Sequence, residues 1–208
     1  MTNEADRGGW LLISVSTAGA AGTLRVQVWR KLRSLGALYL QQSVCLLPDR
    51  TEVAREVRRL LDRVRHQGGT GRMLHVEFSN LGEQDQLIGE LNAARDAEYV
   101  EVLERLPAFL GELEMERARG RATYAEVEES EADLERFRSW LGKIAARDYF
   151  AAPIGAHARD AVQRAADALA DFEQAALSAE APADPAPPQA TSATDRSGNR
   201  RLRAVEDS

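Results

Sequence analysis

Seven basic side chains in two short stretches are the residues of this sequence best suited to bind an anion. They are Arg25, Arg30, Lys31, Arg33, Arg55, Arg58 and Arg59. Guanidinium groups match phosphate oxygens in geometry, and phosphate contacts supply much of the affinity of proteins for nucleic acid. The first stretch is the more suggestive, because no Asp or Glu occurs between Arg7 and Pro48. The seven residues are therefore the candidates for a DNA-binding surface.

Other groups that could do chemistry are few and widely spaced. The three histidines and the single cysteine show no metal-ligand spacing. Cys45 lies between Val44 and Leu46 with no histidine or acid at a recognisable offset, so we expect a buried, inert thiol. The glycine-rich segments 19–22 and 68–71 match no phosphate-binding motif. These features favour a protein that is not an enzyme and needs no metal or cofactor, with a redox enzyme using Cys45 as the weakest alternative.

The charge is divided unevenly along the 208 residues, whose formal net charge is −6. Residues 24–72 hold eleven Lys/Arg against four Asp/Glu, whereas residues 73–177 hold eleven against twenty-two. Such a split is typical of a nucleic-acid-binding surface, but it equally suits two halves that attract each other within the chain or across a dimer. Both interpretations remain open at this point.

The elements that position the basic residues follow from hydrophobic periodicity. Residues 10–17 predict a buried strand, and residues 39–47 predict one bent strand or two short ones that meet near Gln42–Ser43. A helical stripe from Leu24 to Leu35 predicts a first helix that ends at Gly36 with a positive φ. Trp29 lies at the edge of this stripe, where we expect it in the core or in a dimer interface.

A second helix and a further strand follow. Apolar residues from Val53 to Val64 form a regular helical stripe, and Asp49 and Glu52 have the spacing of a capping box at its start. After the glycine-rich break, residues 73–78 alternate as a half-buried strand does. The order predicts a ferredoxin-like β-α-β-β-α-β domain over residues 9–80, with an antiparallel sheet and both helices on one face.

The rest of the chain has a different pattern. Residues 83–177 carry apolar residues three and four apart, which predicts a helical region. Pro107 should end or kink the first of its helices, while Gly120 and residues 153–155 mark further breaks. Residues 178–208 are rich in Ala, Pro and Ser, so we expect a disordered tail. The fold class is therefore α+β.

The composition also bears on the compartment. A single cysteine forms no internal disulfide, which favours a reducing cytoplasm. The apolar runs are too short to span a bilayer. Glu4 and Asp6 stand where a signal peptide is basic. We expect a cytoplasmic protein without a membrane partner.

Four motifs in order resemble the N-terminal domain of the chromate-resistance regulators, the ChrB family. They are a strand starting at Trp10 followed by RVQVWRKLRSLGA (25–37), then LQQSVCLLP (40–48), ARDAEY (94–99) and RDYFAAP (147–153). The resemblance covers about residues 9–175. Cys45 stands where the family usually has an aromatic residue, and longer family members carry a second C-terminal domain that residues 178–208 do not resemble.

The resemblance implies a cytoplasmic, DNA-binding regulator of chromate export genes that responds to chromate. Because chromate is a tetrahedral dianion, its site would need arginines and backbone N–H groups, and Arg25 and Arg30 beside the Ala18–Thr23 loop are the candidates. A plain surface turn is the other interpretation of this loop.

The domain is also similar to small CRISPR adaptation nucleases and to a middle domain of phenylacetate-catabolism repressors. The nucleases place an Asp at the end of the first strand for metal-dependent chemistry, whereas residues 14–17 read SVST here. We therefore expect a ferredoxin-like homodimer that is a non-enzymatic transcriptional regulator acting on promoter DNA. The alternative is an accessory protein-interaction module that binds no DNA and whose acidic helices cover its basic half.

Overall fold

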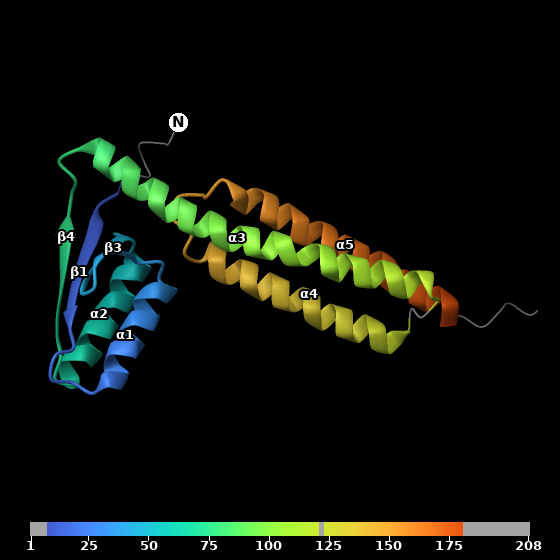
Figure 1. Cartoon of the computed structure of the whole chain (residues 1–208), viewed down its shortest axis with the longest axis horizontal. Helices are drawn as coiled ribbons and strands as arrows, with labels where there is room; N and C mark the ends of the chain where they lie inside the picture. Colours follow the sequence, from blue (N-terminus) through green and yellow to red (C-terminus); the bar gives the residue numbers. More distant parts are fainter. Residues whose placement is uncertain (1–7, 121–122, 181–208) are drawn as a thin grey trace, which may run out of the picture.

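The computed structural model describes residues 8–120 and 123–180. It contains a small sheet with two helices, followed by three long helices that extend away from the sheet as a bundle (Figure 1). The elements in chain order are β1 (Trp10–Ser16), α1 (Gly22–Ser34), β2 (Leu38–Gln41), β3 (Val44–Pro48), α2 (Thr51–His66), β4 (Thr70–Val76), α3 (Leu81–Ala118), α4 (Tyr124–Ala145) and α5 (Ile154–Glu180).

The sheet has the strand order β2-β3-β1-β4, and every neighbouring pair is antiparallel. Ile13 of β1 lies opposite Cys45 of β3 and Met73 of β4. Helices α1 and α2 pack against each other and against Leu11 and Ile13, whose side chains lie on one face of the sheet. The predicted ferredoxin-like α+β fold is confirmed.

The apolar stripes predicted for the two helices form the core of this domain. Leu24, Val28 and Leu32 of α1 are buried, as is the whole stripe of α2. The strand pair is split as predicted, because β2 ends at Gln41 and β3 begins at Val44. Gly36 follows α1 with a φ of 74°, as predicted from its place after the last apolar residue.

Two local predictions in this domain are wrong. The capping box does not form. The N-cap position of α2 is occupied by Arg50 with no side-chain capping hydrogen bond to the helix, and Asp49 Oδ2 lies 2.7 Å from Nδ1 of His75 instead. The last strand runs over Thr70–Val76 rather than residues 73–78, because β4 pairs with the full length of β1. Gly71 permits this early start, as an added Cβ would lie 2.6 Å from Cδ2 of Leu61.

The helical region is confirmed, but its details differ from expectation. Helix α3 continues through Pro107 instead of ending there. Pro107 is exposed while Leu106 and Phe109 on either side pack into the bundle core, so tertiary contacts hold the helix across the missing amide. The breaks near Gly120 and before Ile154 are confirmed. Helix α5 runs to Glu180, three residues into the segment expected to be disordered, and residues 181–208 lie outside the described residues.

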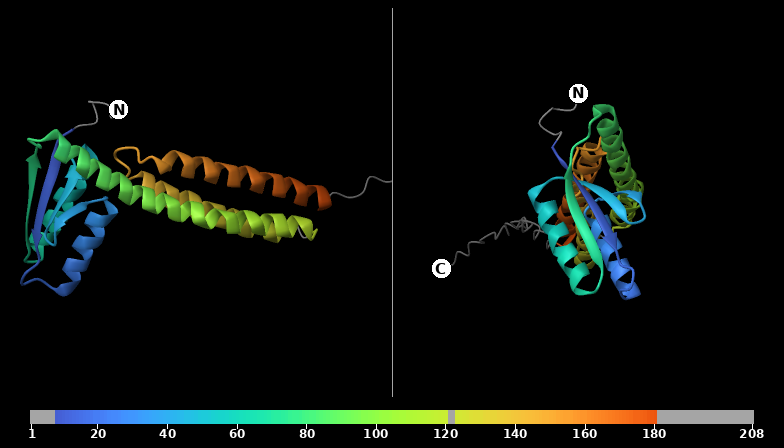
Figure 2. Two further views of the ribbon diagram at one scale, coloured as in Figure 1. Left: turned by 45° about the horizontal axis from the view of Figure 1, so that its top comes forward. Right: turned by 90° about the vertical axis from the view of Figure 1, so that its left-hand side faces the viewer.

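An aromatic cluster joins the second face of the sheet to the bundle. Trp10 is buried and stacks on Phe150 with ring centroids 5.6 Å apart, and it meets Phe78 edge-on. Ile88 and Leu91 from the start of α3 complete the cluster. From this anchor the bundle extends as a rod away from the sheet (Figure 2).

Polar contacts at the same junction connect the end of α1 to the bundle. The Tyr149 hydroxyl donates to the backbone oxygen of Leu35 at 2.8 Å. Glu98 accepts from both Arg95, at 3.1 Å, and Arg147, at 2.6 Å. Gly36 fits tightly against this group, because a Cβ there would lie 3.1 Å from Cβ of Arg147 and 3.1 Å from a guanidinium nitrogen of Arg95. The ARDAEY and RDYFAAP motifs thus supply the joint between the two parts of the chain.

The fit at Gly36 leads to a stability prediction. Gly36→Ala should lower the free energy of unfolding by about 2–3 kcal/mol, since it adds a steric clash to the strain of a positive φ. Gly19→Ala is the matched control, because Gly19 has a φ of 83° with nothing within 4 Å of the added Cβ, and should cost about 1 kcal/mol. Urea unfolding of both variants measures the difference. Equal losses would contradict a tight junction at Gly36.

Candidate functional site

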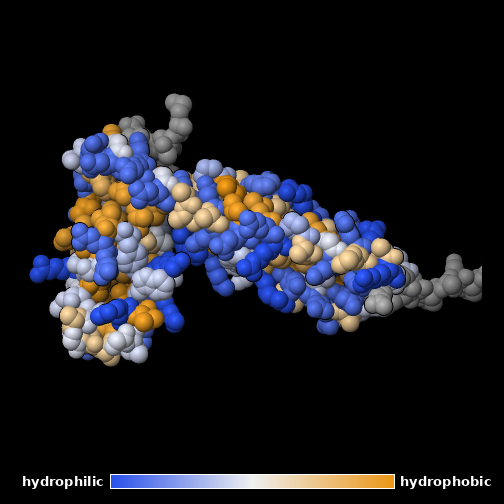
Figure 3. Space-filling view, in the orientation of Figure 1, coloured by the Kyte–Doolittle hydropathy of each residue, from blue (hydrophilic) through white to orange (hydrophobic). Residues whose placement is uncertain are grey.

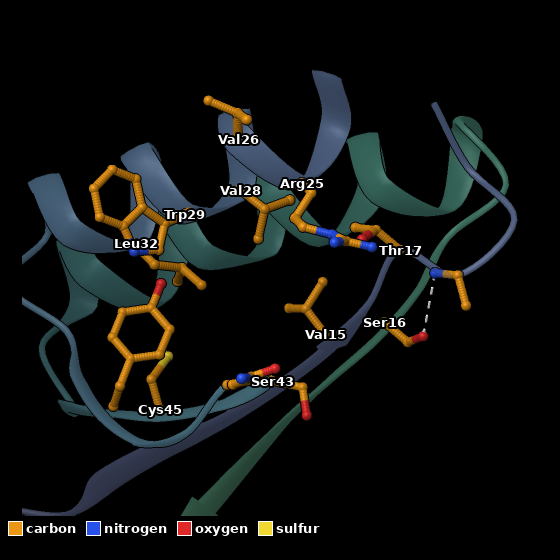
Figure 4. Close-up of a pocket in the computed structure, with 13 residues that line it drawn as sticks. Val15, Ser16, Thr17, Arg25, Val26, Val28, Trp29, Leu32, Ser43 and Cys45 are labelled. Atoms are coloured by element: carbon orange, nitrogen blue, oxygen red, sulfur yellow. Dashed lines mark hydrogen bonds between the residues drawn. The ribbon is translucent and has the colours of Figure 1, made fainter. Parts of the chain in front are cut away.

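A cavity of about 550 Å³ opens between α1, the end of β1 and the β2–β3 turn (Figure 4). Its apolar wall is formed by Val15, Val26, Val28, Trp29 and Leu32. Its more polar side is formed by Ser16, Thr17, Ala18, Arg25, Tyr39, Gln42, Ser43 and Cys45. The strand order creates this space, because β3 lies beside β1 and brings the β2–β3 turn under the first half of α1.

Arg25 gives the cavity its charge. It extends from α1 toward Thr17 in Figure 4, and of the described residues that line the cavity it alone is charged. Within the described part of the chain Arg25 makes no ion pair or hydrogen bond, so its guanidinium group keeps its donors for solvent or a ligand.

The deep end of the cavity is neutral. Burial raises the pKa of the Cys45 thiol to about 12. Burial, with Cys45 as a neighbour, also raises the pKa of Tyr39 to about 12, against a smaller lowering effect of Arg33. Both groups are therefore protonated near neutral pH, and Cys45 lacks the thiolate that nucleophilic or redox chemistry needs.

Several of the predicted DNA-binding residues are engaged within the protein. The carboxylate of Glu56 forms ion pairs with Lys31, at 2.7 Å, and with Arg59, at 2.9 Å. Its hydrogen bond to Lys31 is the largest cause that lowers the pKa of Glu56. Arg55 pairs with Glu52. The glutamates of α2 thus neutralise part of the basic charge of α2 and one lysine of α1.

The other predicted residues remain available. Arg33 lies over the ring of Trp29, 5.1 Å from the ring centroid. Arg25, Arg30 and Arg58 are without an ion-pair or hydrogen-bond partner among the residues that the structure describes. The seven predicted residues therefore do not form one uniform surface, and the unpaired ones are concentrated on α1.

Comparison with known families agrees with the motifs found in the sequence. The model of the N-terminal part of protein ChrB matches residues 25–182. The chain belongs to this family. A search of curated proteins gives no match. The resemblance to the ChrB N-terminal domain is thereby confirmed, and the matched segment begins at Arg25, which lines the cavity.

The structure separates the two residues predicted to bind an oxyanion. Arg25 lines the cavity and Arg30 does not. Five residues of α-helix correspond to a rotation of about 140°, which turns Arg30 to the outer side of α1. An anion in the cavity would therefore meet Arg25 alone of the two.

Most of the residues that line the cavity are not among those predicted from the sequence. Trp29 was expected in the core or in a dimer interface, but its side chain is 46% exposed and walls the cavity, so the core interpretation is wrong. Tyr39, Gln42 and Ser43 were not candidates at all. The break in the strand pair marked Gln42 and Ser43 as a turn, yet only the sheet order places that turn beneath α1.

Among the described residues, no three His, Cys, Asp or Glu side chains gather in a way that would hold a metal ion. Within the same ranges, no helix combines the length and apolar character needed to cross a membrane.

The burial of Cys45 leads to a reactivity prediction. The native protein should react with the thiol reagent DTNB at least about 100-fold more slowly than the same protein in concentrated guanidinium chloride, because thiolate and access are both lacking. Cys45 is the single cysteine, so the absorbance change reports this residue alone. Equal rates in the native and unfolded protein would show that the thiol is accessible and the wall of the cavity open.

Proposed function

We propose that this chain is a non-enzymatic, DNA-binding regulator of genes for chromate resistance and that it acts as a cytoplasmic homodimer. Family membership supports the link to chromate resistance. The observation that carries the DNA-binding part is the charge of α1. This helix holds four basic residues and no acidic one, and Arg25 and Arg30 on it are unpaired within the described chain.

The position of α1 supports contact with a duplex. Phosphate binding needs cations that are exposed and not already neutralised, because its free energy comes from release of counterions. Arg25, Arg30 and Arg33 are all exposed on one helix. Helix α2 adds Arg58, whereas its Arg55 is paired with a glutamate of the same helix. The proposed surface is therefore centred on α1.

The alternative, an accessory module with a covered basic half, fits the arrangement less well. The bundle that carries most of the acidic residues points away from α1 and α2 (Figure 1), and hydrophilic side chains spread over the visible face of the bundle (Figure 3). The glutamates paired with Lys31 and Arg55 belong to α2 itself. The open position of α1 favours the regulator.

Chromate or a similar oxyanion is the effector proposed from the family resemblance. Of its two predicted ligands, Arg25 and Arg30, we keep Arg25, because it alone lines the cavity. The unpaired guanidinium of Arg25 beside the hydroxyls of Ser16 and Thr17 supports a role in anion binding. Since sulfate matches chromate in charge and shape, sulfate should compete with chromate for this site. Calorimetry with both anions tests the proposal, and chromate binding that is untouched by excess sulfate would contradict it.

Charge reversal on α1 tests DNA binding. Replacing Arg25, Arg30 and Arg33 by Glu should weaken binding to the promoter fragment upstream of the gene by at least about 100-fold and reduce the salt slope by about 2–3, the share of three phosphate contacts. Electrophoretic shifts at rising salt measure both quantities.

A triple variant of Arg117, Arg119 and Arg136, all to Glu, is the matched control. It changes the net charge equally, but on α3, its C-cap and α4, so its DNA affinity should stay close to that of the unaltered protein. Circular dichroism confirms that both triples are folded. An equal loss in the two triples, or no shift of the unaltered protein at low salt, would overturn the proposal.

A further inference from the structure

We propose that the cavity between α1 and the β2–β3 turn binds an organic carboxylate with a flat apolar body. The carboxylate would meet Arg25 at the mouth, and the apolar body would lie along the wall formed by Val15, Val28 and Trp29. This inference goes beyond the proposed regulator, because it concerns a ligand class that a bare oxyanion effector does not represent.

The polar part of the cavity suits one anionic group. Arg25 is unpaired within the described residues, and a guanidinium group binds a carboxylate through two parallel hydrogen bonds. The Ser16 hydroxyl accepts from the amide of Ala18 at 3.4 Å, a contact drawn in Figure 4, and so keeps its own proton to donate. Among the described lining residues no carboxylate competes for Arg25.

The apolar wall of the cavity extends beyond the space that an anion bound at Arg25 would occupy. Val15, Val28 and Leu32 line the wall, and next to them Trp29 and Val26 leave 46% and 45% of their surface exposed. Burying exposed apolar side chains of this size against a ligand lowers the free energy, and an indole ring packs well against another aromatic ring. These residues therefore favour a ligand with an apolar body.

The size of the cavity points to the same class of ligand. Small-molecule sites enclose about 300–1,000 Å³, and the 550 Å³ here fall within that range. A tetrahedral inorganic dianion would occupy a small part of this space and leave the apolar wall in contact with water. Arg25 is the single charged lining residue described, and its one positive charge matches the charge of a monocarboxylate.

Isothermal titration calorimetry with 2-naphthoate as the probe tests the inference in the full chain without DNA. The neutral analogue 2-naphthamide and inorganic sulfate serve as partial ligands, since one lacks the charge and the other lacks the apolar body. Naphthoate should bind at least about tenfold more tightly than either. Arg25→Gln should weaken naphthoate binding at least about tenfold. Ser43→Trp, which adds bulk at the lining of the cavity, should also weaken naphthoate binding.

Arg30→Gln is the matched control, because Arg30 is an exposed arginine on the same helix that does not line the cavity. It should leave naphthoate affinity unchanged, and thermal unfolding of the three variants establishes that they are folded. The inference is overturned if naphthoate does not bind, if naphthamide or sulfate binds equally well, or if Arg25→Gln and Arg30→Gln have the same effect. A result of this kind would leave the DNA-binding proposal intact, since that is judged by the electrophoretic shifts.

Discussion

The burial of Trp10 is the interaction on which the rest of the structure depends. Helices α1 and α2 cover one face of the sheet. On the other face, the side chains of Trp10 and Leu46 form an apolar area. Phe150 and the first turns of α3 pack over this area, and Trp10 is only 1% exposed as a result. Because α3 is fixed there, the direction of the whole bundle is fixed with it.

The polar junction beside this cluster gives the joint its specificity. Glu98 lies between Arg95 and Arg147, and Tyr149 reaches the last turn of α1. Burial lowers the pKa of Arg95, and its carboxylate partner Glu98 acts in the opposite direction. Such a group is favourable only in one geometry, since a buried charge without its partner is costly. The junction therefore fixes the C-terminal end of α1.

Helix α1 consequently takes part in three features of the protein. Its last turn belongs to the junction, its inner flank carries Arg25 to the cavity, and its outer side carries Arg30. The absence of acidic residues from α1 leaves these cations unneutralised, whereas α2 pairs Arg55, Arg59 and Arg65 with its own glutamates and aspartate. The overall negative charge of the chain thus coexists with a basic helix that remains open to a partner.

The fold class and the order of the elements could be predicted from the sequence, because hydrophobic periodicity is a local property. The stripe of α2, the break at Gln42–Ser43 and the positive φ of Gly36 all followed from it. It also singled out Arg25. Only the tertiary structure decided that Trp29 is half-exposed and that the β2–β3 turn faces α1. These features depend on strand order and on contacts between residues far apart in the chain, which no local pattern encodes. The same reason explains why helix α3 continues through Pro107, which its local sequence predicts to end or kink the helix.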